Sequence, residues 1–477
     1  MQSILAILVT VTAFDAVKAF SLYKKDVPTV VALEISRNHV LDPAVRDLKR
    51  RRSMTVNETL DNEETLYFSN ITLGTPAQKL RLTLDTGSSD LWCNTASSSF
   101  CSKKNSECSI SGTYDANSSS TYKYLSSDFN ISYVDGSGAS GDYVTDTLSI
   151  GGVSLTSFQF GIGYTSDSIE GVLGIGYTKN EVQVNRDRKS SYPNLPQAMV
   201  DGGLINRNAY SLWLNDLDAN TGSILFGGVD NGKYDGSLQT LPILAIDGSY
   251  AEFLIVLTGV SYNNGSINKS YSSDELPAAV LLDSGSSLTY LPDTIVEDIY
   301  NDFGVTYDSS SGTGYVPCTL MNKDLNITFT FSSPSITIAI NEMVLAAGTG
   351  STFSDGTPAC VFGIAPAGST TAVLGDTFLR SAYVVYDLAN NEISLAQTKF
   401  NSAEENVVEI GSGTTAVPGA TAVSNPVITV AGAGTATMTG SPETTVATSS
   451  NAASRSLTGD LGCLGAMVIT TGFFLTL

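Results

Sequence analysis

Two aspartates of the chain stand in nearly the same short sequence. Asp85 lies in the segment 84–89, which reads Leu-Asp-Thr-Gly-Ser-Ser, and Asp283 lies in the segment 282–287, which reads Leu-Asp-Ser-Gly-Ser-Ser. In each copy, a glycine two residues after the aspartate permits a tight turn, and a serine three residues after it can hydrogen-bond the carboxylate. One such copy alone is explained as well by a strand that ends in a turn. Two copies favour a shared chemical role for the two carboxylates.

The chemistry open to two neighbouring carboxylates is hydrolysis by an activated water. Carboxylates held within hydrogen-bond distance share one proton, because both cannot easily be ionised. The ionised one can act as general base on a water while the protonated one polarises a carbonyl group. This mechanism needs no metal, cofactor or covalent intermediate, and we expect none. The chain has one histidine, His39, in a segment expected to be removed, which excludes a Ser-His-Asp triad, a Cys-His pair and a histidine-rich zinc site.

A second short motif is repeated at almost the same spacing. The sequence Val-Leu-Gly of residues 172–174 returns at residues 373–375, 201 residues later, and the two aspartates are 198 residues apart. The nearly equal offsets indicate a duplicated unit of about 200 residues. Apolar and polar residues alternate in segments such as 80–84 and 336–340, which predicts strands. We therefore expect an all-β protein of two similar lobes related by an approximate dyad, with a cleft between them.

Both ends of the chain read as processing signals. Residues 4–14 form an apolar run too short to span a bilayer, so we expect a secretory signal over residues 1–19. The basic run 49–52 is expected to end a propeptide of residues 20–52, although it is also explained as a solvated charge run. The apolar residues 461–477 follow small residues that begin at Asn451, which is the pattern of a GPI-anchor signal. We expect removal of residues 452–477 and a lipid on Asn451; a transmembrane helix is the alternative.

Composition divides the rest of the chain. Residues 401–451 are rich in Thr, Ser, Ala, Gly and Val, so we expect an unfolded stalk there, with an N-terminal lobe at 53–240 and a C-terminal lobe at 241–400. Residues 53–451 hold 15 basic and 41 acidic residues, which disfavours nucleic acid as a partner and favours an acidic working environment. The segment 20–52 is net basic, which suits an inhibitor held over an acidic cleft.

The cysteines and glycosylation sequons fit a secreted chain. Cys101 with Cys108 closes a short polar loop. Because Cys463 would leave with the removed tail, Cys318 with Cys360 is the one pairing left in the second half of the chain. Cys93 is interpreted as a buried free thiol, and its pairing with Cys108 stays open. The Asn-x-Ser/Thr sequons begin at Asn57, Asn70, Asn117, Asn130, Asn264, Asn268 and Asn326.

These motifs resemble those of the pepsin-type aspartic proteases. Besides the two aspartate motifs, the segments 133–137, 374–380 and 386–387 are similar to that family, and the similarity covers about residues 62–400. With its processing signals, stalk and anchor signal, the whole chain resembles the fungal GPI-anchored members, the yapsins. The resemblance implies a bilobal pepsin-like fold and an aspartic endopeptidase.

The resemblance also implies roles for single residues. It implies that Asp85 and Asp283 are the catalytic pair, supported by Thr86, Gly87, Ser88, Ser284, Gly285 and Ser286. Tyr133 is then the flap tyrosine, Trp92 is its packing and hydrogen-bond partner, and Asp135 and Gly136 belong to the flap. Ser284 stands where threonine is common in the family, and we expect its hydroxyl to make the same bond across the lobes.

The expected substrates are proteins and peptides bound in an extended form. Yapsin-like enzymes prefer basic sites, and Asp135 could place a carboxylate beside the residue that precedes the scissile bond. Alternatively, Asp135 and Gly136 only form the hairpin turn of the flap. A broad-specificity acid protease and an inactive anchored wall glycoprotein or adhesin are the other candidate functions. We expect a monomer at the cell surface, held to the plasma membrane by its lipid or transferred to the wall.

Overall fold

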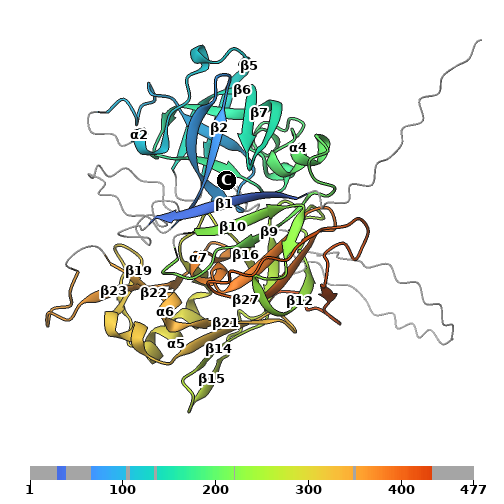
Figure 1. The fold of residues 1–477 in the computed structure, drawn as a ribbon. Helices are drawn as coiled ribbons and strands as arrows, with labels where there is room; N and C mark the ends of the chain where they lie inside the picture. Colours follow the sequence, from blue (N-terminus) through green and yellow to red (C-terminus); the bar gives the residue numbers. More distant parts are fainter. Residues whose placement is uncertain are drawn as a thin grey trace, which may run out of the picture.

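The computed structural model describes residues 30–38, 66–103, 108–133, 137–219, 221–347 and 351–431. Two lobes lie one above the other and are joined by strands that run between them (Figure 1). Strands dominate both lobes, as the alternating pattern predicts, and no helix of the described residues is long and apolar enough to cross a membrane.

The N-terminal lobe is a sheet with strand order β2-β3-β8-β4-β7-β6-β5. The predicted alternation in β3 buries Leu80, Leu82 and Leu84 in the core. Short helices and loops cover the edges of the sheet. The elements of this lobe are β2 (Leu66–Leu73), β3 (Gln78–Asp85), β4 (Leu91–Asn94), α2 (Cys108–Ser111), a 3-10 helix (Ala116–Ser118), β5 (Lys123–Ser132), β6 (Gly138–Ile150), β7 (Val153–Ser166), β8 (Gly171–Gly174), a 3-10 helix (Thr178–Asn180), α3 (Val182–Asn185) and α4 (Leu195–Asp201).

The C-terminal lobe is built from three smaller sheets and α5. This helix follows Pro292 and ends at Gly304, whose φ of 64° is a left-handed conformation that favours glycine. The elements of this lobe are β13 (Leu254–Leu257), β14 (Gly259–Asn263), β15 (Asn268–Tyr271), β16 (Ala278–Leu282), β17 (Thr289–Leu291), α5 (Asp293–Phe303), β18 (Thr306–Asp308), β19 (Thr313–Pro317), a 3-10 helix (Cys318–Asn322), β20 (Asn326–Thr330), β21 (Ser335–Ala339), α6 (Ile340–Met343), β22 (Val344–Ala346), β23 (Ala359–Phe362), β24 (Ile364–Pro366), β25 (Ala372–Leu374) and α7 (Asp376–Leu379).

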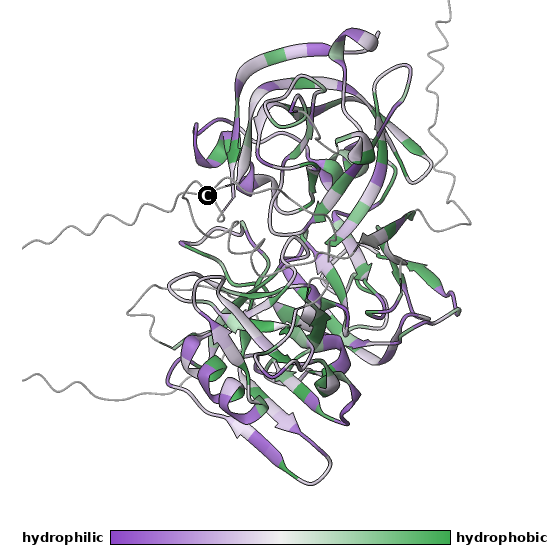
Figure 2. Ribbon diagram, turned by 90° about the vertical axis from the view of Figure 1, so that its left-hand side faces the viewer, coloured by the Kyte–Doolittle hydropathy of each residue, from purple (hydrophilic) through white to green (hydrophobic). Residues whose placement is uncertain are grey.

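A group of strands from both halves of the chain lies between the lobes, in the order β12-β27-β26-β9-β10-β1. An aromatic cluster connects this sheet to both lobes: Tyr386 stacks on Tyr210 at 4.9 Å between ring centroids and meets Phe253 edge-on at 4.7 Å, and Phe253 also contacts Tyr177 at 5.2 Å. Hydrophobic segments gather inside the molecule and hydrophilic ones lie on its outer loops (Figure 2). The strands concerned are β1 (Val31–Asn38), β9 (Ala209–Trp213), β10 (Thr221–Phe226), β12 (Tyr234–Pro242), β26 (Ala382–Asp387) and β27 (Glu392–Thr398).

Strand β1 belongs to the segment predicted to be a propeptide. It pairs antiparallel with β10 on one side and with β2 on the other, and its Val31, Leu33 and Ile35 are buried. The described part of this segment is therefore held by main-chain pairing and apolar burial within the sheet between the lobes, and not by charge. The rest of the segment, the signal and the basic run lie outside the described residues.

The prediction of an unfolded stalk is wrong for residues 401–431. This stretch adds β28 (Val407–Glu409), which pairs with β11 (Gly228–Asp230), and β29 (Thr421–Ala422), which pairs with β12. Ile410 is fully buried, and Ile428 packs against an apolar cluster of the C-terminal lobe. A few apolar residues among small polar ones suffice here because the folded lobe already offers a surface to cover. Residues 432–451 of the predicted stalk, and Asn451 with the anchor signal, lie outside the described residues.

Candidate active site

Both aspartate motifs form the same turn directly after a strand. The carboxylate of Asp85 accepts the amide of Gly87 at 2.8 Å and the hydroxyl of Ser88 at 2.6 Å. The carboxylate of Asp283 accepts the amide of Gly285 at 2.8 Å and the hydroxyl of Ser286 at 2.7 Å. The two supporting serines are therefore bonded as the sequence predicts, and each carboxylate is held in a fixed orientation.

The second repeated motif positions the ends of the two strands. Strand β3 pairs in parallel with β8, which places Asp85 opposite Gly174, and β16 pairs in parallel with β25, which places Leu282 opposite Leu374. A Cβ atom on Gly174 would lie 2.6 Å from the amide nitrogen of Ser89, so only glycine allows this close approach. The duplicated unit thus corresponds to the same strand arrangement built twice.

The two motifs are bonded directly to each other across the lobes. The Thr86 hydroxyl donates to the Leu282 carbonyl at 2.9 Å, and the Ser284 hydroxyl donates to the Leu84 carbonyl at 2.9 Å. Ser284 therefore makes the cross-lobe bond expected of it in place of threonine. All four residues are buried in this contact.

The two carboxylates face the same small space. A Cβ atom on Gly285 would lie 2.6 Å from Oδ1 of Asp85 and 3.1 Å from Oδ1 of Asp283. On the other motif, a Cβ atom on Gly87 would lie 2.6 Å from Oδ1 of Asp283. Each glycine therefore touches the carboxylate of the opposite motif, and the space that a side chain would fill is left to the carboxyl groups. This arrangement suits a water held between two carboxylates.

The flap lies on the hairpin of β5 and β6. The indole Nε1 of Trp92 donates to the hydroxyl of Tyr133 at 2.7 Å, which is the partnership that the family resemblance implies. The amide of Tyr133 donates to the carbonyl of Ser137 at 2.8 Å and closes the hairpin. Asp135 and Gly136, predicted to belong to the flap, lie outside the described residues.

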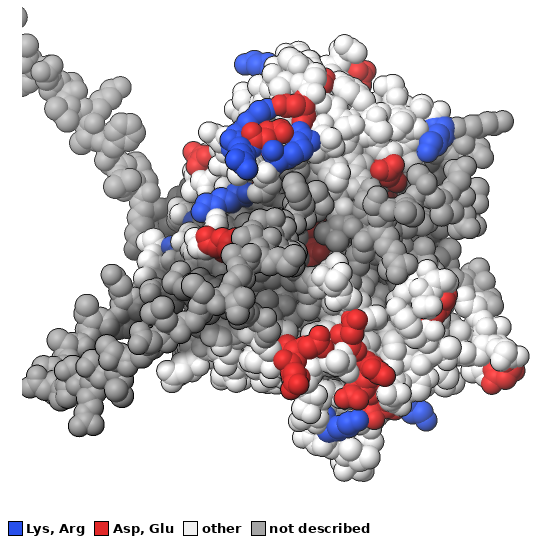
Figure 3. Space-filling view, turned by 180° about the vertical axis from the view of Figure 1, so that it is seen from behind, with Lys and Arg blue, Asp and Glu red and all other residues white. Residues whose placement is uncertain are grey.

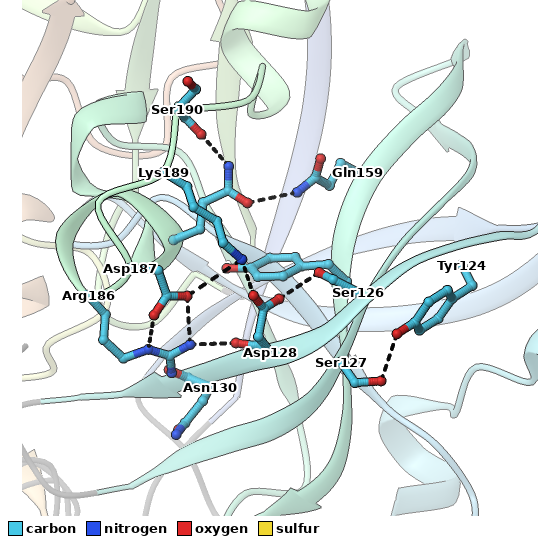
Figure 4. A network of polar contacts seen from close by, with 12 residues as sticks. Tyr124, Ser126, Ser127, Asp128, Asn130, Gln159, Arg186, Asp187, Lys189 and Ser190 are labelled. Carbon is cyan, nitrogen blue, oxygen red and sulfur yellow. Dashed lines mark hydrogen bonds and ion pairs between the residues drawn. The ribbon is translucent and has the colours of Figure 1, made fainter.

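A loop that the sequence does not connect with the flap packs beside it. Arg186, which follows α3, donates to the main-chain oxygens of Asp128 and Asn130 on β5, the latter at 2.6 Å, and is held by the carboxylate of Asp187 (Figure 4). Lys189 of the same loop forms an ion pair with Asp128. In the sequence these residues appear only as a short charged run, because their partners are more than 50 positions away.

Two buried acids lie behind the flap partner Trp92. The carboxylate of Asp90 accepts the hydroxyls of Tyr192 at 2.7 Å and Tyr143 at 3.0 Å, together with the amide of Val182 at 2.9 Å. Burial raises the pKa of Asp90, although these three donors oppose the change. Burial likewise raises the pKa of its neighbour Glu181 to about 9, and the charge of Asp90 adds to this.

The cysteine predictions are confirmed. Cys101 is bonded to Cys108 and Cys318 to Cys360, while Cys93 is a buried free thiol. The pairing of Cys93 with Cys108 is thereby excluded. Burial raises the pKa of the Cys93 thiol well above its usual range, so this residue is an inert part of the core.

The predicted sequons lie mainly on the surface. Asn70, Asn117, Asn130 and Asn268 are exposed, Asn264 and Asn326 are half-buried, and Asn57 lies outside the described residues. Charged side chains are unevenly distributed over the face opposite that of Figure 1: acidic groups gather on the C-terminal lobe, whereas basic and acidic groups mix on the N-terminal lobe (Figure 3).

The fold and the paired carboxylates define an aspartic protease of the pepsin type. The chain belongs to this class, because the model of the eukaryotic aspartyl protease family matches residues 66–398. It is an aspartic-type endopeptidase that acts on proteins and peptides.

Comparison with single proteins refines this placement. The chain is 63% identical over 443 residues to the probable aspartic-type endopeptidase opsB of Aspergillus oryzae, covering 92% of this chain and 91% of that one. It is 36% identical over 379 residues to the aspartic proteinase yapsin-3 of Saccharomyces cerevisiae, covering 77% and 72%. Among solved structures, an aspartic proteinase from Irpex lacteus has the same fold, with a TM-score of 0.58 and 21% identity, over 79% of this chain and all of that one.

Proposed function

We propose that Asp85 and Asp283 are the catalytic pair of this endopeptidase and that it works at acidic pH. One carboxylate removes a proton from the water held between them, and the other, which carries the shared proton, polarises the carbonyl of the peptide bond. The water attacks that carbonyl carbon, and the bond to the leaving nitrogen then breaks as the nitrogen gains a proton. The convergence of both carboxyl groups on the space beside Gly285 carries this assignment.

An inactive anchored glycoprotein is the alternative from another functional class. Such a protein would have no need for the hydroxyl and amide donors that orient both carboxylates, and all four are in place. The test is hydrolysis of a casein-like protein at acidic pH by the secreted enzyme, with and without a statine inhibitor. Inhibitor-sensitive hydrolysis is expected; no hydrolysis by a folded protein would favour the alternative.

We also propose a preference for sites with Lys or Arg. The similarity to yapsin-3 and the excess of acidic over basic residues in residues 53–451 support it. A broad-specificity acid protease remains the second candidate, because the chain is also 41% identical over 363 residues to the acid protease of Saccharomycopsis fibuligera. Cleavage-site profiling on a diverse peptide library decides between them.

The place of action that we propose is the fungal cell surface. A secretory signal at residues 1–19, a propeptide at 20–52, glycosylated sequons and a GPI lipid on Asn451 follow from the sequence patterns. The four exposed sequon asparagines are accessible to the modifying enzyme. Release of the protein from intact cells by a phospholipase that cleaves GPI lipids tests the anchor, and a protein that stays bound unless the wall is digested would point to transfer to the wall.

A further inference from the structure

Glu252 lies near Asp283 at the end of a strand pair. Strands β13 and β16 pair antiparallel, and the amide of Leu282 donates to the carbonyl of Phe253 at 3.2 Å. One residue beyond this bond on each chain segment stand Glu252 and Asp283, and the charge of Asp283 acts on the carboxyl group of Glu252. Glu252 and Asp283 thus flank the paired ends of β13 and β16, and both lie at the same end of this sheet.

No hydrogen bond or ion pair of the described residues joins a basic side chain to Glu252, and Lys179, which approaches the same loop, donates instead to the hydroxyl of Ser249 at 3.3 Å. Among the described residues, its half-buried carboxyl group has no hydrogen-bond or ion-pair partner, in contrast to Asp90 with its three donors. Burial raises the pKa of Glu252, and the negative charge of Asp283 raises it further. Strand β25, on the other side of β16, is apolar and ends at Leu374, opposite Leu282, and the buried Asp376 follows two residues later. Burying a carboxyl group beside another anion lowers the stability of the fold. The same group can bind a cation strongly, because hydrogen bonds between charged groups are strong.

We propose that Glu252 is a specificity-determining residue, which binds the side chain of a substrate Lys or Arg close to the scissile bond. The proposal rests on Asp85 and Asp283 being the catalytic pair, because its position beside Asp283 is what brings Glu252 near the bond to be cut. It deepens the proposed basic preference by assigning it to a carboxylate on the C-terminal lobe. An incoming ammonium or guanidinium group is attracted by Glu252 and favours the ionised form of its carboxyl group.

This role has a signature in the pH dependence of the specificity. At low pH the carboxyl group of Glu252 is neutral and attracts a cation weakly, and as pH rises it ionises, so the preference for a basic residue should increase. Asp283 is the charged group whose effect on Glu252 is known. It is unchanged in all the variants compared below. The ratio of kcat/KM for a Lys peptide to that for the matching Met peptide removes effects common to both peptides, and comparison of this ratio with that of Glu252→Gln removes the attraction of Lys by Asp283.

The test uses the full chain expressed in a fungal host and purified in its processed form. Peptides that carry Lys or Met at each of the three positions on either side of the scissile bond are compared for the parent enzyme, Glu252→Gln and Asp135→Thr. We expect Glu252→Gln to lower the Lys/Met ratio about tenfold to a hundredfold at one position, the size expected for loss of one charge-assisted contact, and to remove its rise with pH. Asp135→Thr should act at a different position. Glu252→Lys should favour Glu over Met at the position that Glu252→Gln identifies.

Other outcomes distinguish the ways in which the proposal can fail. An unchanged Lys/Met ratio at all positions in a folded Glu252→Gln variant, as judged by its melting temperature, overturns it. So does an equal loss on all peptides, which indicates a contact with the substrate main chain. If the parent enzyme hydrolyses none of the peptides in a statine-sensitive manner, the proposed catalytic pair fails and takes this inference with it. Hydrolysis without any basic preference leaves the catalytic pair standing and refutes the role of Glu252.

Discussion

Thr86 and Ser284, which lie 198 residues apart, each donate a main-chain amide to the hydroxyl of the other, at 3.2 and 3.0 Å. Each hydroxyl in turn donates to a carbonyl that precedes the opposite aspartate. The two turns that carry Asp85 and Asp283 are thus held by a symmetric set of buried bonds, so the lobes cannot separate here without leaving these groups without partners. The alignment of the carboxylates depends on this contact.

Replacing Ser284 should therefore affect both stability and turnover. Ser284→Ala removes the hydroxyl bonds and leaves the amide of Thr86 and the carbonyl of Leu84 unpaired, which should cost about 2 to 4 kcal/mol of folding free energy. We expect a lower melting temperature and a kcat reduced about tenfold, because small misplacements of reacting groups are costly. Ser284→Thr keeps the hydroxyl and is the matched control. Equal behaviour of the two variants would contradict the role of the bond.

The catalytic assignment predicts loss of activity without loss of fold. Asp85→Asn and Asp283→Asn are nearly isosteric, but each removes either the base or the shared proton, so peptide hydrolysis should fall at least 1000-fold, roughly the upper range for a lost acid or base. Statine-sensitive turnover and melting temperature are measured on the same preparations. Substantial residual turnover in a single variant, once contaminating protease is excluded, would refute the pair.

The raised pKa of Glu181 predicts that the free energy of unfolding falls as pH rises. Its pKa is about 9 in the folded protein against 4.5 for an ordinary glutamate, so the folded state binds a proton that the unfolded state has lost over this window. The contribution of Glu181 to the free energy of unfolding is greatest below pH 4.5 and is lost as pH rises toward 9. The slope is up to about 1.4 kcal/mol per pH unit.

The variant Glu181→Gln isolates this contribution. An amide oxygen can still accept the amide of Tyr192, which now donates to Glu181 Oε2 at 2.8 Å. Denaturant unfolding between pH 5 and pH 8 should show a smaller loss of stability in this variant than in the parent. The exposed Glu405→Gln is the control, because it removes a charge without a buried carboxyl group. If the free energy of unfolding changes with pH equally in the parent and in Glu181→Gln, the pKa of Glu181 is not raised by folding, and the prediction fails.

Arg186 is predicted to position the flap. Arg186→Ala removes the donors to the main-chain oxygens of Asp128 and Asn130, so β5 should be less well held. KM should then rise about three- to tenfold, the size expected for loss of roughly one ordinary hydrogen bond. Arg186→Lys keeps the charge but lacks the fork that reaches both oxygens, and should behave like Ala. Arg188→Ala is the matched control, since Arg188 lies in the same loop and its side chain takes no part in the hydrogen bonds or ion pairs of the described residues. A loss in Arg188→Ala equal to that in Arg186→Ala would indicate a general charge effect.

The predicted processing is tested by the mature N-terminus. Cleavage after the basic run 49–52 should give a chain that begins at or near Ser53. N-terminal sequencing of the secreted enzyme decides this, and a start upstream of His39 would refute the propeptide and the absence of histidine from the mature enzyme.

Local patterns and distant contacts differ in how far the sequence reveals them. The turns around Asp85 and Asp283 were predictable because each is encoded within six residues and repeated, and Cys318 and Cys360 because no other pairing was available. The neighbourhood of Glu252 and Asp283 was not, because it depends on the register of two strands.

Composition also misled in one place. Residues 401–431 resemble a stalk, since single residues such as Ile410 and Ile428 are too few to form a core of their own. They are buried because they complete the core of a lobe that is already folded. The amino-acid composition of a short segment gives no information about the surface on which the segment packs.

The position of β1 has a consequence for the concentration at which the enzyme can mature. If residues 31–38 leave after cleavage, β10 and β2 each lose a neighbour in the middle of a sheet and expose unpaired amides and carbonyls. Unpaired strand edges are templates for other strands, including those of a second molecule. The chain itself must cover the freed edges before a second molecule binds to them. A high concentration of the enzyme during activation should therefore favour aggregation over formation of the active monomer.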